Sequence, residues 1–274
     1  MTLTIGTGPF GSQSSGTFNF DTQVLQAHTL YLEDSPRRVR VVFDGETVAD
    51  SRRVKLLHET GHLPIYYFPT EDVRMDLLEK SDHTTHCPFK GNASYWSVKV
   101  GDKVAENAVW SYPEPIDSAP PLCGLVAFYW NKMDEWYEES ERVFVHARDP
   151  YHRVDVLDSD RHVRIKVNGE VVAETDRPKL LFETGLPTRY YIPPEDVYEE
   201  FLIPSDKETQ CPYKGVASYW SVEAGGERVE DLVWTYKEPI PESSKIKGYL
   251  CFFNEHVGLE VDGEEQTKPQ TQWS

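Results

Sequence analysis

The sequence lacks any apolar run near the roughly 20 residues that a membrane-spanning helix needs. It is also poor in positive charge, with 28 Lys and Arg against 46 Asp and Glu, which gives a net charge of −18. A surface of that sign repels phosphate backbones and anionic lipid head groups. We therefore expect neither nucleic acid nor a membrane surface as a partner.

Cysteine is scarce as well. The four cysteines, Cys87, Cys123, Cys211 and Cys251, form no CxxC pair. The first 20 residues contain no Lys or Arg and no apolar stretch typical of a signal peptide. These features predict a cytoplasmic protein with reduced thiols. Its 39% hydrophobic and 27% charged residues are typical of a globular chain.

What the sequence does have is an internal repeat. The segment CPFKGNASYWSV begins at Cys87, and CPYKGVASYWSV begins at Cys211, so ten of twelve positions are identical at an offset of 124 residues. The same offset relates Val39 to Val163 and Trp110 to Trp234 without a gap. Such a repeat predicts two copies of one domain.

The repeat sets the expected domain organisation. We predict a flexible lead-in over residues 1–26, a first domain over 27–148, a second over 149–263, and a loose tail over 264–274. Two fused copies would also allow intramolecular pseudo-twofold pairing.

Local patterns predict a mostly β fold. Runs of β-branched and aromatic residues such as Val39–Phe43 and Val163–Val167 are followed by Asp44-Gly45 and Asn168-Gly169, which favour hairpin turns. Proline and acidic residues at 69–72 and 193–196 predict one short helix in each copy. The expected architecture is two homologous antiparallel domains, barrel- or sandwich-like.

Two histidine clusters suggest metal ligands, and both are rejected. His58-Glu59-Thr60-Gly61-His62 matches the HExxH zinc motif, but Gly61 and the following proline disfavour the helix that the motif requires. The second copy keeps the glutamate and loses both histidines. The cluster at His83 and His86 keeps only its cysteine in the second copy. We predict no metal and no cofactor.

The repeated block is the better candidate for a site. Lys90 and Lys214 stand in Pro/Gly turns, where a cation could reach an anionic or carbonyl group of a ligand. Alternation along the following strand sends Tyr95 and Ser97 to one face and Trp96 to the other. The alternative is that the aromatic residues are core and the lysines solvated.

A proton-transfer group could complete this site. Glu59 and Glu183 precede Thr-Gly turns, where a carboxylate either binds backbone N–H groups or faces a pocket. The predicted catalytic residues are Glu59, His86 and Lys90. The predicted binding residues are Tyr66, Tyr95, Trp96, Glu183, Tyr190, Lys214, Tyr219 and Trp220.

These residues predict a protein that binds a small polar metabolite in an aromatic and lysine-lined pocket, with enzymatic action on it left open. The alternative is a non-catalytic interaction or scaffold module built from two β domains.

The repeated core, ETG…YY…EDV…CPxKGxASYWSV, resembles the bacterial and fungal domain-of-unknown-function family 427 in its tandem form. The resemblance covers nearly all of both copies. It implies a compact β fold without an established activity. The family also carries a nucleotidyltransferase label. The DxD-like Asp158-Ser159-Asp160 gives that label no support, because no Gly-Ser element leading into a helix precedes it.

Overall fold

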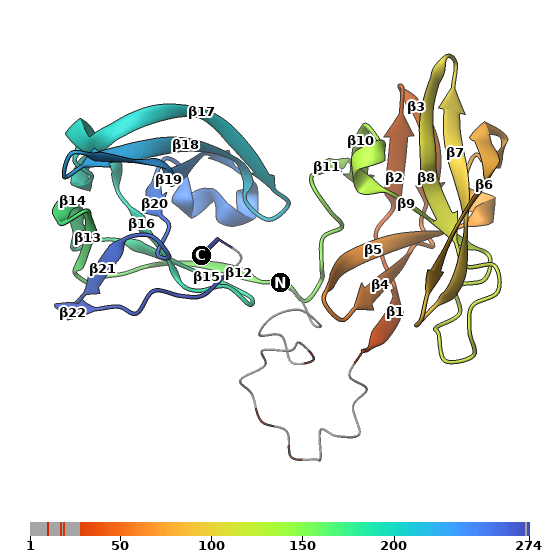
Figure 1. Cartoon of the computed structure of the whole chain (residues 1–274), viewed down its shortest axis with the longest axis horizontal. Coiled ribbons are helices and arrows are strands. Elements are labelled where there is room, and N and C mark those ends of the chain that lie inside the picture. Colours follow the sequence, from red (N-terminus) through yellow and green to blue (C-terminus); the bar gives the residue numbers. More distant parts are fainter. Residues whose placement is uncertain (1–9, 11–16, 18, 20–27, 272) are drawn as a thin grey trace. The chain divides into compact units, whose positions relative to one another are not determined.

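The computed structural model describes residues 10, 17, 19, 28–271, 273 and 274. Backbone contacts divide the chain into two compact units, with the boundary in the sequence between Asp149 and Pro150. Both are built mainly from antiparallel strands (Figure 1), which confirms the predicted fold class. The lead-in predicted over residues 1–26 lies almost entirely outside the described residues. In the described part of the chain, no helix has the length and apolar character needed to cross a membrane.

Over the described residues, each unit contains a seven-stranded and a four-stranded sheet. In the first unit the larger sheet has the order β1 (Leu30–Asp34), β4 (Lys55–Glu59), β5 (His62–Pro69), β9 (Leu125–Phe128), β8 (Lys103–Ser111), β7 (Gly91–Val100), β6 (Leu78–Cys87). The smaller sheet has the order β11 (Glu141–Val143), β10 (Glu135–Glu138), β2 (Val39–Phe43), β3 (Glu46–Ser51).

The second unit repeats this topology strand for strand. Its larger sheet runs β12 (Val154–Asp158), β15 (Lys179–Glu183), β16 (Arg189–Ile192), β20 (Leu250–Phe252), β19 (Glu227–Pro239), β18 (Gly215–Ala224), β17 (Leu202–Cys211). Its smaller sheet runs β14 (Glu170–Thr175), β13 (Val163–Val167), β21 (Gly258–Val261), β22 (Glu264–Glu265). The predicted hairpin turns follow β2 and β13, with positive φ at Asp44 and Asn168.

The larger sheet buries both of its faces, so neighbouring residues enter different cores. Leu56 and Tyr66 pack between the two sheets, in what we call the inter-sheet core. Leu57 and Tyr67, one residue further along each strand, pack on the opposite face, in what we call the inner core. This explains why the strands read as continuous apolar runs instead of alternating ones.

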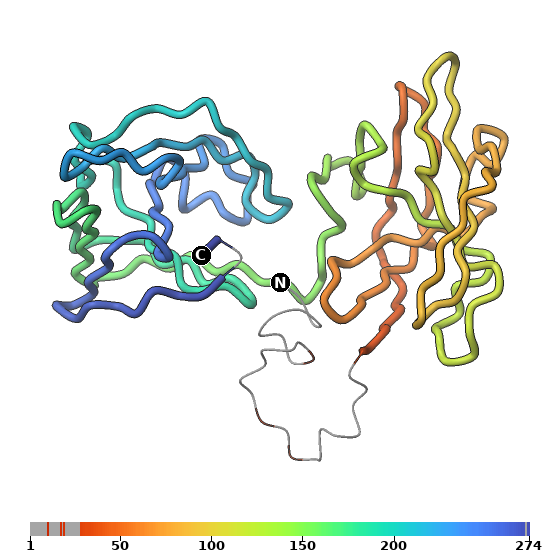
Figure 2. Tube along the Cα trace, viewed as in Figure 1, coloured from red at the N-terminus to blue at the C-terminus, as the bar shows by residue number. Residues whose placement is uncertain are grey.

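The inner core is closed by the long connection between β8 and β9, drawn yellow-green in Figure 2, which contributes Leu122. In the second unit the corresponding connection forms the 3₁₀ segment η7 (Pro241–Ile246) and contributes Ile246. The larger sheet therefore encloses apolar side chains without a second sheet on that side.

The short helix predicted in each copy takes the form of two short 3₁₀ helices. The first unit has η2 (Thr70–Asp72) and η3 (Met75–Leu77), and the second has η5 (Pro194–Asp196) and η6 (Glu199–Phe201). A further 3₁₀ turn, η4 (Trp130–Lys132), follows β9. The helix stops after one turn because Val73 is extended and forms a bridge with Ala49, as Val197 does with Ala173.

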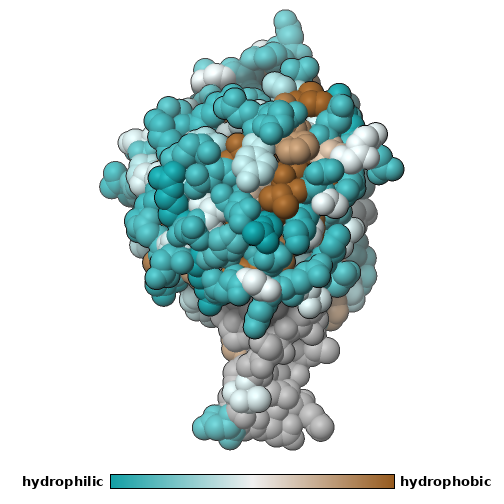
Figure 3. Space-filling view, turned by 90° about the vertical axis from the view of Figure 1, so that its left-hand side faces the viewer, coloured by the Kyte–Doolittle hydropathy of each residue, from teal (hydrophilic) through white to brown (hydrophobic). Residues whose placement is uncertain are grey.

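The surface is dominated by polar side chains. The face of the molecule in Figure 3 is largely hydrophilic, with a small group of apolar side chains. The segment over 264–274 begins with β22, which pairs with β21, and Thr271 and Trp273 contact Glu255 and Arg189.

Gly91 and Gly215, which follow Lys90 and Lys214, adopt the same left-handed backbone conformation in the two units. Gly91 has φ +104°, and a Cβ there would lie 3.2 Å from the Glu114 carbonyl oxygen; Gly215 has φ +106° and would meet the Glu238 oxygen at 3.2 Å. We expect Gly91→Ala and Gly215→Ala each to lower the free energy of unfolding by roughly 2–3 kcal/mol. Gly45→Ala, with φ +76° and nothing within 4 Å, should cost only ~1 kcal/mol. If urea unfolding shows the same loss of stability for Gly45→Ala as for Gly91→Ala and Gly215→Ala, the close contact of Gly91 and Gly215 with the carbonyl oxygens is contradicted.

Candidate functional site

A buried group of three polar side chains lies at one end of the inner core of the first unit. Lys90, in the turn between β6 and β7, donates through Nζ to Glu59 Oε2. His28 Nε2 lies 3.0 Å from Glu59 Oε1. The side chains of Lys90, Glu59 and His28 are 9%, 7% and 20% exposed.

The second unit contains the same group at an offset of 124 residues. Lys214 donates to Glu183 Oε2, and His152 Nε2 lies 3.0 Å from Glu183 Oε1. Here the histidine side chain is only 3% exposed. We call these two groups the Lys–Glu–His groups.

The position of each group requires the larger sheet to curl. Glu59 ends β4, which is next to one edge of the sheet, whereas Lys90 follows the strand at the other edge. Their contact brings the two edges together at this end. The Thr60 N–H donates to the Thr29 carbonyl, and the Thr29 N–H donates to Thr60 Oγ1 at 2.9 Å, which holds His28 beside Glu59.

An aromatic ring covers each histidine. Phe89 stacks on His28 with ring centroids 3.7 Å apart and planes at 10°. In the second unit Tyr213 stacks on His152 at 3.9 Å and 27°. Phe89 is 41% exposed, so it offers a flat apolar surface beside His28.

Tyrosine and tryptophan side chains extend the group into the inner core. Trp110 Nε1 donates to the Tyr67 hydroxyl at 3.3 Å, and Trp234 donates to Tyr191 at 3.1 Å. The Tyr95 hydroxyl lies 2.8 Å from Thr85 Oγ1, and the same pair recurs in the second unit between Tyr219 and Thr209. Lys90 Nζ is also 5.8 Å from the ring centre of Tyr112.

The electrostatics keep both carboxylates ionised and Lys214 protonated. Burial alone would raise the pKa of Glu59, but hydrogen bonds from Lys90 and His28 outweigh it and lower that pKa. In the second unit burial is again opposed, here by the charge of Lys214, and the pKa of Glu183 falls to about 2. Burial would lower the pKa of Lys214, yet the charge of Glu183 raises it. A lysine held in this way is a cation and not a nucleophile.

The tyrosines nearby stay neutral. Burial, their largest influence, raises the pKa of Tyr67 and Tyr112 far above the ordinary value of 10. They therefore serve as hydroxyl donors and acceptors, not as phenolates.

Six of the predicted site residues face the inner core: Glu59, Lys90, Tyr95, Glu183, Lys214 and Tyr219. The structure does not bring the other aromatic candidates to them. Tyr66 and Trp96 belong to the inter-sheet core, as do Tyr190 and Trp220 in the second unit. The reason is the two-residue period of a strand, which sends each of these side chains away from the face that its neighbour lines.

His86, the third predicted catalytic residue, lies away from this group. It is exposed on the edge strand β6, and its Nδ1 is 2.7 Å from Asn92 Oδ1. Its neighbour Thr85 faces the inner core instead, through its contact with Tyr95.

The HExxH stretch forms the β4–β5 hairpin and not a helix, as its glycine and proline predict. His58 is buried, and its Nε2 is 2.8 Å from Glu33 Oε1. Within the described residues, no group of three or more His, Cys, Asp or Glu could hold a metal ion. Asp158 of the DxD-like stretch accepts from Lys179 at 2.5 Å and from Lys245 at 3.4 Å, at an exposed position at the end of β12.

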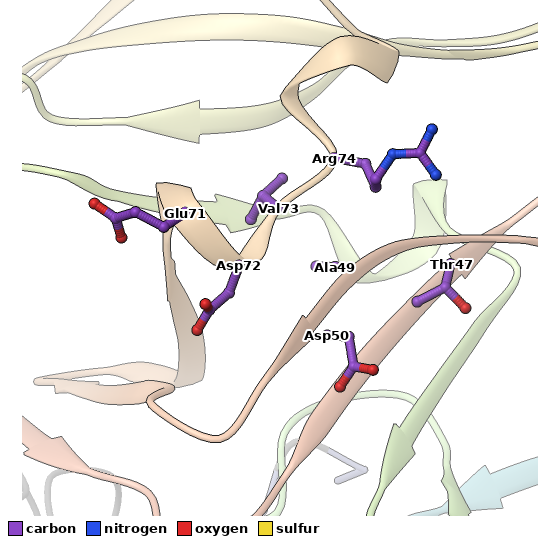
Figure 4. A pocket seen from close by; sticks show the side chains of 7 residues that line it. All are labelled: Thr47, Ala49, Asp50, Glu71, Asp72, Val73 and Arg74. Carbon is purple, nitrogen blue, oxygen red and sulfur yellow. The ribbon is translucent and has the colours of Figure 1, made fainter.

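A separate open hollow of about 340 Å³ lies between β3 and η2 (Figure 4). It is lined by Thr47, Ala49, Asp50, Glu71, Asp72, Val73 and Arg74. None of the predicted site residues contributes to it. Its carboxylates Asp50 and Asp72 already accept from Arg38 and Arg53.

The sequence interpretation missed His28, Tyr67 and Tyr112 as site residues. The signal was present, because His28 precedes His152 by the same 124 residues that separate the two lysines.

The geometry defines a class of protein: two tandem antiparallel β domains, each with a buried Lys–Glu–His group against an aromatic inner core. A family model described as a domain of unknown function (DUF427) matches residues 31–139 and 155–263. The chain belongs to this family and contains two tandem copies of its domain, which confirms the resemblance seen in the sequence. A comparison with curated proteins gives no match.

The buried ion pair predicts a strong penalty for removing one partner. Glu59→Gln leaves the Lys90 charge buried without its counter-ion and should lower the free energy of unfolding by roughly 3–5 kcal/mol. Replacing both side chains, Glu59→Leu with Lys90→Met, should cost less than either single change. Denaturant unfolding of Glu59→Gln, of Glu59→Leu, of Lys90→Met and of the Glu59→Leu/Lys90→Met double variant checks this. Additive losses would show that the two charges do not depend on each other.

The lowered pKa of Glu183 predicts an acid-sensitive contribution to stability. The folded pKa of about 2 lies below the ordinary 4.5, so the contribution is complete above about 4.5 and is lost as pH falls toward 2. Glu183→Gln should reduce stability at neutral pH and flatten its fall between pH 5 and 2. Urea unfolding across that range measures both. Glu199→Gln, at an exposed position on η6, should leave the slope unchanged.

Proposed function

We propose that the chain is a cytoplasmic ligand-binding protein whose first unit binds a small polar molecule beside His28. The observation that carries the proposal is the duplicated Lys–Glu–His group, which has the same hydrogen bonds in both units and a buried Lys–Glu pair in each.

Its burial argues for a role beyond stability. Two charges removed from water recover their desolvation cost only in part, and well-packed apolar residues often serve a fold equally well. Both copies nevertheless keep Lys, Glu and His. By contrast, the residues just before the two glutamates, His58 and Phe182, differ in type and in burial. Titratable groups perturbed in this way cluster at functional sites.

The group fixes the proton arrangement of its histidine. An ionised Glu59 accepts only, so the Nε2 of His28 must carry the proton in the 3.0 Å contact. In the neutral ring, Nδ1 is then the acceptor, and Glu59 stabilises any positive charge that develops there. The Lys90–Glu59 pair is therefore a support that positions His28 as a hydrogen-bond or proton acceptor.

This arrangement changes the role first expected for the lysine. The charge of Lys90 is compensated by Glu59, and the protein has a net charge of −18, so an anionic ligand is disfavoured. A ligand with an O–H or N–H donor for His28 and an apolar edge for Phe89 fits better. The first unit is the favoured copy because its histidine side chain is 20% exposed and that of the second is 3%.

A matched pair of variants tests the proposal. Compounds from a library of small polar metabolites that raise the melting temperature of the parent should lose most of that shift with His28→Asn. They should keep it with His152→Asn. Compounds that stabilise both variants as well as the parent would place the ligand elsewhere.

The tautomer gives a second readout that needs no ligand. Long-range ¹⁵N NMR of the histidine rings should show His28 protonated at Nε2 near neutral pH. Glu59→Gln should weaken that preference. A ring protonated at Nδ1 in the parent would contradict the proposed acceptor.

A further inference from the structure

The C-terminal segment of the chain is anchored to the second unit through side chains. The Thr271 hydroxyl donates to Glu255 Oε1 at 2.6 Å. The Trp273 ring centre lies 5.6 Å from the Arg189 guanidinium and 6.4 Å from the ring of Phe253. A polar stretch without regular secondary structure, residues 266–270, separates these residues from β22.

The receiving surface is a buried ion pair between aromatic rings. Arg189 Nη1 and Nη2 donate to the two oxygens of Glu255 at 2.7 and 2.8 Å, and the two side chains are 5% and 0% exposed. The guanidinium also lies 5.6 Å from the ring of Trp234 and 5.9 Å from that of Phe253. A guanidinium in this setting binds a further ring by cation–π attraction, while the carboxylate accepts a hydroxyl proton.

The first unit shows that the fold does not need this pair. The positions 124 residues earlier hold Ile65 and Asn131, and the same seven-stranded sheet forms around them. Arg189 and Glu255 are therefore particular to the unit that receives the segment.

The segment has the properties of a tethered peptide ligand. It is shaped by its own hydrogen bonds, with the Trp273 N–H donating to Thr271 Oγ1 at 3.1 Å and the Ser274 N–H to the Thr271 carbonyl at 3.2 Å. Trp273 remains 38% exposed, so the ring rests on the surface and is not part of a core.

We propose that Arg189, Glu255, Trp234 and Phe253 form a peptide-binding site for a segment with a threonine two residues before a tryptophan, and that the C-terminal segment of this chain occupies it in cis. The site shares Trp234 with the inner core of the second unit but contains no residue of the first unit, so it stands or falls independently of the function proposed for His28.

The test uses the full chain with the anchors removed, Thr271→Ala with Trp273→Ala, and a fluorescent peptide with the sequence of residues 268–274. Fluorescence anisotropy should show that this variant binds the peptide. The parent should bind at least ten-fold more weakly, because its own tether supplies a local concentration on the order of mM. Peptides carrying Thr271→Ala or Trp273→Ala should each bind the variant chain at least ten-fold more weakly than the unaltered peptide.

A control changes the receiving surface. Arg189→Ile and Glu255→Asn, which introduce the residues found at the equivalent positions of the first unit, are added to the Thr271→Ala/Trp273→Ala chain. Peptide binding should be lost while circular dichroism stays unchanged. If Arg189→Ile with Glu255→Asn unfolds the chain, the peptides carrying Thr271→Ala or Trp273→Ala still test the proposal, because they are measured against a chain with an unaltered binding surface. Absent binding, equal binding of altered peptides, or equal binding by the parent would overturn the proposal.

Discussion

The contact between Lys90 and Glu59, repeated by Lys214 and Glu183, is the interaction on which the arrangement of each unit depends. It joins the hairpin at one edge of the seven-stranded sheet to the strand next to the opposite edge. Because neither ion is solvated, each needs the other, and the sheet must curl far enough to bring them together. That curl creates the inner core, which in turn buries the pair and strengthens its attraction.

The repeat made much of the fold predictable, because an offset of 124 residues relates the strands of the first copy, as far as β9, to those of the second. For the last two strands of each unit the register pairs residues 123 apart. The face of each aromatic residue was harder to predict. Tyr66 and Tyr67 are both buried, one in each core, so hydrophobicity does not indicate which tyrosine lies beside Glu59. A one-residue choice in a strand exchanges the faces, and only the structure decides it. Likewise, the helices expected after Pro69 and Pro193 depend on local preference, which the bridge at Val73 overrides.

The glutamate and the lysine of the site were predictable as residue types near turns, but their partner was not. Glu59 and Lys90 lie 31 residues apart in sequence and meet only through the curl of the sheet. His28 precedes the first strand and lies outside the CPxKGxASYWSV block, in which the two copies are most similar. Applying the repeat offset to His152 would have revealed it. The general lesson is that an internal repeat acts as a two-sequence alignment, and its weakest matches at domain boundaries carry information too.

The two units also separate what the fold needs from what each copy has added. Where both units share a feature that costs free energy to bury, such as the Lys–Glu–His group, a common role explains its retention better than chance does. Where the two units differ, the difference is in the type and the exposure of side chains around the shared sheets. Phe182 is 40% exposed, whereas the equivalent His58 is buried against Glu33, and Arg189 with Glu255 replaces an isoleucine and an asparagine. The Lys–Glu–His group is the same in both units, whereas the side chains around it differ. One arrangement of buried charges is therefore compatible with two surfaces of different chemistry, because the charged residues and the differing residues occupy different positions on the sheet.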